Sequence, residues 1–186
     1  MPSLTFNHTL LVGSTGMLAD AARWLIARSN HALVLGRDQE KLRRVTDSAP
    51  DRATPAPIDH HDRPALQSLL RTHTERRGSF DLALVWLHSD ALPSLPTIAD
   101  ACTHDARLIL VRSSATADFS RPTPPEAAIL DKLTICVQRV VLGFVIEPSG
   151  SRWLTDEEIS QGAIDAITSG KPHSMVGVTE PWESRP

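Results

Sequence analysis

The sequence contains no tyrosine, so no phenol can serve as a proton donor anywhere in this protein. It has only two cysteines, Cys102 and Cys136. Both lie in apolar patterns without metal-site spacing, so we expect buried free thiols in a reducing compartment. No apolar run approaches the roughly 20 residues of a transmembrane helix, so no membrane span is predicted.

A large excess of one charge is also missing. The 186 residues carry a formal net charge of −3 and the pI is about 6.2, which favours neither a nucleic-acid nor a membrane partner. The N-terminus lacks the charged and apolar segments of a signal peptide. We therefore expect a cytoplasmic protein that acts on a small molecule. The length fits one domain, predicted over residues 1–178, followed by a polar tail over 179–186.

Short apolar runs alternate with amphipathic segments along the chain. The runs expected as strands cover residues 9–12, 32–35, 53–58, 80–87, 107–111, 134–142 and 174–178. Pro55 and Pro57 cannot donate ladder hydrogen bonds, so the third run suits an edge strand. The alternation predicts an α/β fold: a single Rossmann-like, doubly wound domain with a mostly parallel sheet of about seven strands and helices on both faces.

Several helix boundaries follow from capping chemistry. Asp38 and Asp62 are expected N-caps, and Thr155 with Glu158 forms a capping box. A first helix is expected from residue 16 to about residue 29.

The first apolar run ends in a turn that contains two glycines. Its residues are Gly13, Ser14, Thr15, Gly16, Met17 and Leu18. Gly13 can take a turn conformation closed to bulkier residues, and Gly16 lets a pyrophosphate approach the backbone. A strand, a turn and a helix in this order offer N–H groups and a positive helix end to a phosphate. The alternative is a tight strand-to-helix turn that binds nothing.

Other polar residues follow the predicted strands. They are Arg37, Asp59, His60, His88, Ser113 and Ser114. In parallel α/β sheets, ligands bind outside the carboxyl ends of the strands. We therefore expect these residues and the glycine turn to form one site.

Taken in order, these segments resemble the short-chain dehydrogenase/reductase family. The segments that carry the resemblance are the turn 13–18, Gly36–Leu42, Ile58–Asp59, Ile109–Ser114 and Ile135–Val145. In the last segment Leu142 stands where the family usually has proline. The resemblance implies a nicotinamide dinucleotide held at the glycine turn.

The end of the second predicted strand favours NADP(H) over NAD(H). Family members that prefer NAD usually have an acidic residue there, whereas this chain has Gly36 followed by Arg37. A guanidinium suits a 2′-phosphate, although Arg37 is also explained as a solvated residue at a helix start. Asp59 resembles the family residue that bonds the adenine edge, or else it is a turn or cap residue. His60, beside it, is a further cofactor-binding candidate.

The catalytic half departs from the family. Its members rely on a tyrosine four residues before a lysine, on a long helix between the fifth and sixth strands. Only about twenty residues separate Ser113 from the sixth predicted strand, and the spacing of Lys132 does not match. We expect that helix to be deleted. The usual dimer interface would be lost with it, which predicts a monomer or a non-standard homodimer.

The remaining candidate for acid–base chemistry is His88, whose ordinary pKa of about 6.5 suits proton transfer near neutrality. Ser113 or Ser114 is positioned to polarise a substrate oxygen. The alternatives are a structural histidine and serines that simply end a strand. The pair His60–His61 lacks a third ligand, so no metal site is expected.

Three functions are consistent with these residues. The first, which we favour, is a small NADP-dependent oxidoreductase that transfers hydride to or from a C=O or C=N substrate without a catalytic tyrosine. The second is a non-catalytic NADP(H)-binding sensor or regulatory protein. The third is a non-redox acid–base enzyme on the same scaffold, with His88 as its acid or base.

Overall fold

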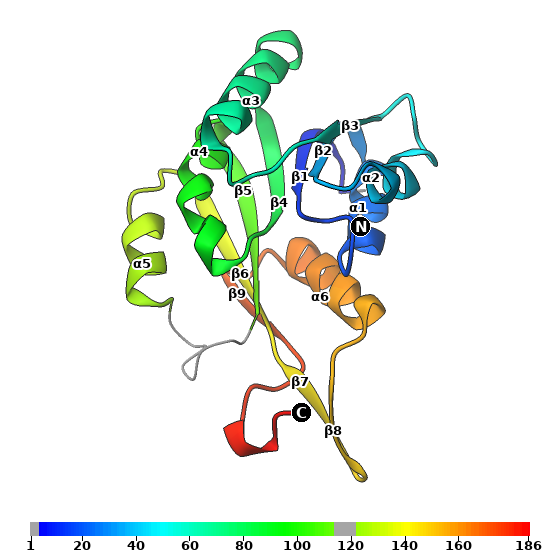
Figure 1. Ribbon diagram of the computed structural model, residues 1–186, viewed down its shortest axis with the longest axis vertical. Coiled ribbons are helices and arrows are strands. Elements are labelled where there is room, and N and C mark those ends of the chain that lie inside the picture. Colours follow the sequence, from blue (N-terminus) through cyan, green and yellow to red (C-terminus); the bar gives the residue numbers. More distant parts are fainter. Residues whose placement is uncertain (1–3, 114–121) are drawn as a thin grey trace.

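The computed structural model describes residues 4–113 and 122–186. A seven-stranded sheet runs through it in the order β3-β2-β1-β4-β5-β6-β9, and every neighbouring pair is parallel (Figure 1). The strands are β1 (Phe6–Val12), β2 (Ser29–Gly36), β3 (Ala53–Pro57), β4 (Phe80–Trp86), β5 (Cys102–Ser113), β6 (Cys136–Leu142) and β9 (His173–Val176). The predicted α/β fold is confirmed, and β3 with its two prolines is an edge strand, as expected.

Helices cover both faces of the sheet. One face packs on α1 (Ala19–Ile26), α2 (Gln39–Thr46) and α6 (Asp156–Ser169). The other packs on α3 (Arg63–Arg77), α4 (Leu95–Ala99) and the end of α5 (Pro124–Leu130). Alternate residues of each strand enter opposite cores: Leu11 of β1 joins the first, and Leu10 and Val12 the second. From β1 the chain adds β2 and β3 on one side and β4, β5, β6 and β9 on the other, so the strand order reverses between β1 and β4. Ligands bind at this point in such folds.

The predicted caps are confirmed. Asp38 accepts hydrogen bonds from the backbone of α2, and Asp62 accepts one from the backbone of α3. Thr155 and Glu158 form the capping box of α6. The first helix is shorter than expected, because Ser29 already pairs with Phe6 as the first residue of β2.

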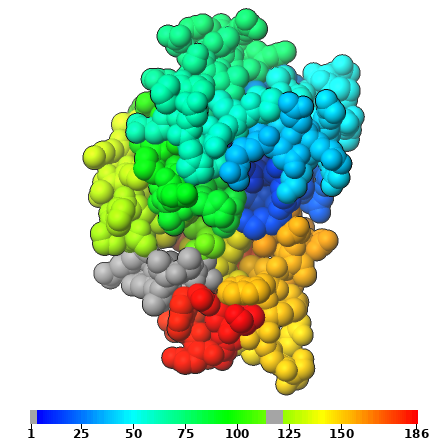
Figure 2. Space-filling model, viewed as in Figure 1, coloured from blue at the N-terminus to red at the C-terminus, as the bar shows by residue number. Residues whose placement is uncertain are grey.

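An antiparallel hairpin, β7 (Phe144–Glu147) and β8 (Gly150–Trp153), was not expected. The chain returns to this hairpin after β9, where Phe144 pairs with Val178. Figure 2 shows the C-terminal residues beside the hairpin, at the end of the molecule opposite α3. Thr179 is buried there.

The cysteine prediction was partly wrong. Both thiols are free, but Cys136, the first residue of β6, is exposed. Cys102 is partly buried, and burial raises the pKa of its thiol to about 12. Among the described residues, no helix has the length and apolar character needed to cross a bilayer.

Candidate functional site

A cavity of about 190 Å³ lies at the carboxyl ends of β1, β2 and β4. It is lined by Gly13, Thr15, Gly36, Arg37, Asp38, Lys41, His60, Trp86 and His88. Some residues of the glycine turn and some of the polar residues after the strands, which were expected to form one site, therefore line the same cavity. The sequence analysis missed Lys41, which lies in the first turn of α2, four residues after Arg37.

Gly13 is where β1, β2 and β4 converge at this cavity. Its φ is +67°, and a Cβ added there would lie 2.4 Å from the carbonyl oxygen of Trp86. Its N–H donates to the carbonyl of Leu35 at 3.3 Å. Only glycine satisfies both the conformation and the close approach. At Gly16, by contrast, an added Cβ would meet no described atom within 4 Å, so the outer part of the turn is open.

The other turn residues differ in what they expose. Ser14 is fully buried, and its hydroxyl has no hydrogen-bond partner among the described residues. The Met17 carbonyl accepts a hydrogen bond from Ser160 of α6 at 2.9 Å. Leu18 is buried in the core. Met17 and Leu18 therefore anchor the turn to the core, whereas Ser14 is left with an unused donor.

Arg37 and Lys41 contribute positive charge at the cavity, and both are exposed. The neighbouring carboxylate of Asp38 accepts the N–H groups of Glu40 and Lys41 at 2.9 and 3.1 Å, which lowers the pKa of Asp38. That carboxylate is engaged in capping α2, so the two cations remain the side chains suited to an anion.

Asp59 does not line the cavity. Its carboxylate accepts the backbone N–H of His61 at 3.0 Å and lies 2.8 Å from Nδ1 of the same residue. These bonds lower the pKa of Asp59, and the Asp59 carboxylate raises the pKa of His61. Asp59 acts here as the turn residue that the sequence left as an alternative.

His60 does reach the cavity, and it is buried. Burial lowers the pKa of its imidazole, and Nε2 has no partner among the described atoms. The backbone carbonyl of His60 accepts a hydrogen bond from Ser94 at 2.6 Å, which fixes the residue in place.

His88 follows β4 and lines the same cavity. Its ring meets Trp86 edge to face, with centroids 5.7 Å apart, and the side chain is exposed. Ser113 is exposed at the carboxyl end of β5 and does not line the cavity. Ser114 lies outside the described residues. Of the two catalytic candidates that the structure describes, His88 lines the cavity and Ser113 does not.

The loop that carries His88 is held by Arg112 of β5, which sequence reasoning missed. Its guanidinium donates to the carbonyl of Leu87 at 2.6 Å and to the hydroxyl of Ser89 at 3.2 Å. Arg112 also pairs with Glu126 of α5 at 3.5 Å, and Glu126 pairs with Arg139 of β6 at 3.3 Å. Glu126 and Arg139 are buried, so buried charges connect α5 with β5 and β6.

Between β5 and β6, the described residues contain one helix, the seven-residue α5. Residues 114–121 of this connection lie outside the description, so the expected loss of a longer helix stays a prediction. A larger hollow, of about 660 Å³, lies between α6 and β9 and contains none of the predicted site residues.

No protein-family model matches the chain, and no curated protein does. Solved structures do resemble it. A metagenomic short-chain oxidoreductase in complex with NADP has a TM-score of 0.66 and 17% identity, over 95% of this chain and 98% of that chain. A double mutant of a Serratia marcescens short-chain dehydrogenase/reductase has a TM-score of 0.66 and 15% identity, over 96% of this chain and 98% of that chain. A Burkholderia phymatum short-chain dehydrogenase/reductase in complex with NAD has a TM-score of 0.70 and 10% identity, over 95% of this chain and 90% of that chain.

These likenesses establish the fold. The chain has the fold of the short-chain dehydrogenases/reductases over nearly its whole length, as the sequence resemblance implied.

Proposed function

We propose that this protein binds NADP(H) at the cavity between β1, β2 and β4 and is a small oxidoreductase. The observation that carries the proposal is the Gly13 turn at the switch point of the sheet, with Arg37 and Lys41 at the same cavity. Structures of the same fold in complex with NADP and with NAD support it.

The residues present fit such a cofactor. The unpartnered hydroxyl of Ser14 and the open space at Gly16 suit a pyrophosphate at the start of α1. Gly36 carries no charge to repel a 2′-phosphate, and Arg37 and Lys41 supply two cations for it. This combination favours NADP(H) over NAD(H).

When bound, a nicotinamide dinucleotide supplies hydride transfer. What this chain adds is binding, orientation and a proton. His88 follows β4 and is in contact with solvent, so as an imidazolium it could donate a proton to the oxygen of a carbonyl substrate. A C=N substrate in the iminium form needs no such proton, which suits a protein without tyrosine. The substrate is therefore a small carbonyl or imine compound.

The alternative is NADP(H) binding without turnover, as in a sensor or regulatory protein. The absence of tyrosine favours it. The oligomeric state, a monomer or a non-standard homodimer, stays a prediction.

The binding test is a titration with NADPH and with NADH, in which binding is measured as energy transfer from tryptophan to the reduced nicotinamide. Trp86 lines the cavity and is the expected donor. We expect micromolar NADPH binding that weakens roughly ten- to hundredfold in Arg37→Glu, because a charge-assisted bond is replaced by repulsion. Arg43→Glu makes the same charge change at a residue of α2 that does not line the cavity, and it should leave binding nearly unaltered. Binding of neither nucleotide would overturn the proposal.

The turnover test uses His88→Gln with panels of carbonyl and imine substrates. If His88 is the proton donor, carbonyl reduction falls while NADPH affinity and imine reduction are kept. NADPH binding without turnover of any substrate in either panel would favour the sensor instead.

A further inference from the structure

Three histidines converge at the end of the sheet opposite the nucleotide cavity. His8 lies near the start of β1, His31 near the start of β2, and His73 on α3. His8 and His31 are partners in the parallel register, so their side chains emerge side by side. One ring nitrogen from each of the three histidines lies within 4.8 Å of the other two.

The spacing of the closest pair matches metal ligation. Nε2 of His8 and Nε2 of His73 are 3.2 Å apart. In a tetrahedral zinc site, with Zn–N bonds of about 2.0–2.1 Å, ligand nitrogens are separated by about 3.3 Å. The ligand nitrogen of His31 lies within 4.8 Å of the other two.

Neighbouring groups orient two of the rings. Nδ1 of His8 donates to the carbonyl of Gly78 at 2.8 Å, which leaves Nε2 with its lone pair directed at the cluster. Nε2 of His31 lies 3.1 Å from the hydroxyl of Thr54. Nδ1 of His31 is buried and has no partner among the described atoms. Donation of the second ring N–H to a neighbouring oxygen is the usual arrangement around a ligating histidine.

The surroundings keep the rings uncharged. His8 is 1% exposed and His31 7%, and the ring of Phe80 lies 4.1 Å from that of His8. Burial lowers the pKa of His8 and brings the pKa values of His31 and His73 to about 4. Arg77 adds positive potential at all three rings and Arg76 at His73, whereas the Asp81 carboxylate adds negative potential at His8. Three neutral imidazoles are the form in which histidine binds a metal.

We propose that His8, His31 and His73 form a binding site for a divalent transition metal of the zinc class. The three imidazoles supply three ligands, and a water enters on the side of His73, the most exposed of the three. Because the ligands come from β1, β2 and α3, the bound metal cross-links this helix to the sheet. The site is separate from the nucleotide cavity, so it stands whether or not the chain binds NADP(H).

The test is a titration of the chelator-treated full chain with Co²⁺, in which the visible d–d absorption of the bound Co²⁺ is measured. Zn²⁺ is then added in competition. We expect one equivalent to bind with the absorption of tetrahedral nitrogen coordination, and Zn²⁺ to displace it. We also expect Zn²⁺ to raise the Tm of the wild type, because a ligand that binds only the folded state stabilises it.

The decisive variant is His73→Phe, which keeps a ring against Phe80 but removes the ligand. We expect Co²⁺ affinity to fall by at least about tenfold, and the Tm rise with Zn²⁺ to disappear. His31→Gln is a second variant, and circular dichroism checks that each is folded. The matched control is the double variant His60→Gln, His61→Gln. It removes both histidines of the other group that could hold a metal, which consists of Asp59, His60 and His61.

Retention of the Co²⁺ band in the control, together with its loss in both His73→Phe and His31→Gln, supports the proposal. It is overturned if the wild type shows neither a band nor a Tm rise, if the band survives in His73→Phe, or if it is lost only in the control.

Discussion

At the scale of single residues, the two glycines of the first turn have different physical roles. Gly13 has a left-handed conformation, and a Cβ added there would lie 2.4 Å from the Trp86 carbonyl oxygen, so no side chain fits. Gly16 has neither constraint, and the space beside it is open. Gly13 is therefore required for the backbone of β1 and β4 to approach each other at the switch point, whereas Gly16 leaves space for a ligand beside the turn.

This difference predicts opposite behaviour for two alanine substitutions. Gly13→Ala should lower the free energy of unfolding by more than about 2 kcal/mol, because strain at positive φ adds to a backbone clash. Gly16→Ala should leave that free energy nearly unchanged but weaken NADPH binding. Urea denaturation and NADPH titration of both variants measure this. Equal stability of the two variants would contradict the assignment.

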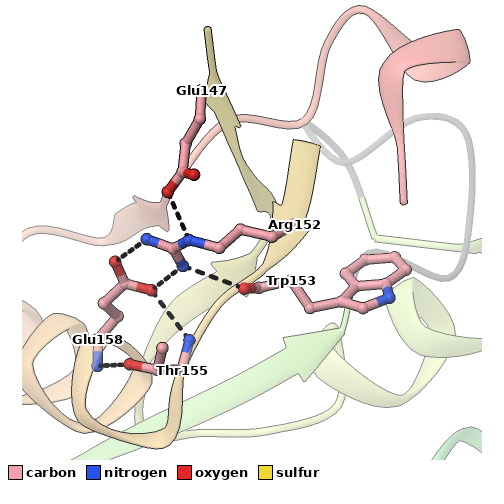
Figure 3. Close-up of polar contacts among 5 residues, drawn as sticks. All are labelled: Glu147, Arg152, Trp153, Thr155 and Glu158. Carbon is pink, nitrogen blue, oxygen red and sulfur yellow. Dashed lines mark hydrogen bonds and ion pairs between the residues drawn. The ribbon is translucent and has the colours of Figure 1, made fainter. Parts of the chain in front are cut away.

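At the scale of elements, one carboxylate serves both the start of α6 and the β7–β8 hairpin (Figure 3). Glu158 accepts the N–H of Thr155 at 2.9 Å, and the Thr155 hydroxyl accepts the N–H of Glu158 at 3.2 Å. The same carboxylate accepts two hydrogen bonds from Arg152, at 2.9 and 3.0 Å, and Arg152 also donates to Glu147 at 2.6 Å. Arg152 thus ties the hairpin to the helix cap.

The Arg152 guanidinium lowers the pKa of Glu158 from 4.5 to about 2. A lowered folded-state pKa stabilises the fold above the unfolded-state value, and this stabilisation is lost as the pH falls through the folded-state value. The wild type should therefore be more stable than Glu158→Gln at pH 6. The difference should shrink below about pH 4.5 and vanish near pH 2. Urea denaturation across this range measures it, with Asp156→Asn as the control from the same helical turn. A difference independent of pH would contradict the ion pair.

At the scale of the whole molecule, α5 is joined to the sheet by buried charges. Glu126 forms ion pairs with Arg112 of β5 and Arg139 of β6. Arg112 also donates a hydrogen bond to the carbonyl of Leu87, the residue before His88. One carboxylate therefore connects α5, two strands and the edge of the candidate site.

Glu126→Ala should lower the free energy of unfolding by about 3 kcal/mol or more, because it leaves two guanidinium groups without their carboxylate. Glu75→Ala, at an exposed position of α3, should change it by less than about 0.5 kcal/mol. Urea denaturation compares the two. A small effect at Glu126 would mean that water can replace the carboxylate.

The sequence alone determined the features that depend on neighbours along the chain. The prolines of β3 exclude a central strand, and Asp38, Asp62 and Thr155 cap helices within three residues of themselves. Apolar runs alternating with amphipathic segments were sufficient to predict the α/β sheet, because each run needs burial on both faces.

Only the tertiary structure decided which distant side chains meet. Residues 144–153 form a hairpin, although the apolar pattern alone did not separate it from β6. Lys41 joins Arg37, Trp86 and His88 at one cavity, whereas Asp59 turns to His61. His8 and His73 are 65 residues apart, yet their rings touch. Such pairings depend on strand register and on how helices pack against the sheet, and neither property is encoded in the local pattern of residues.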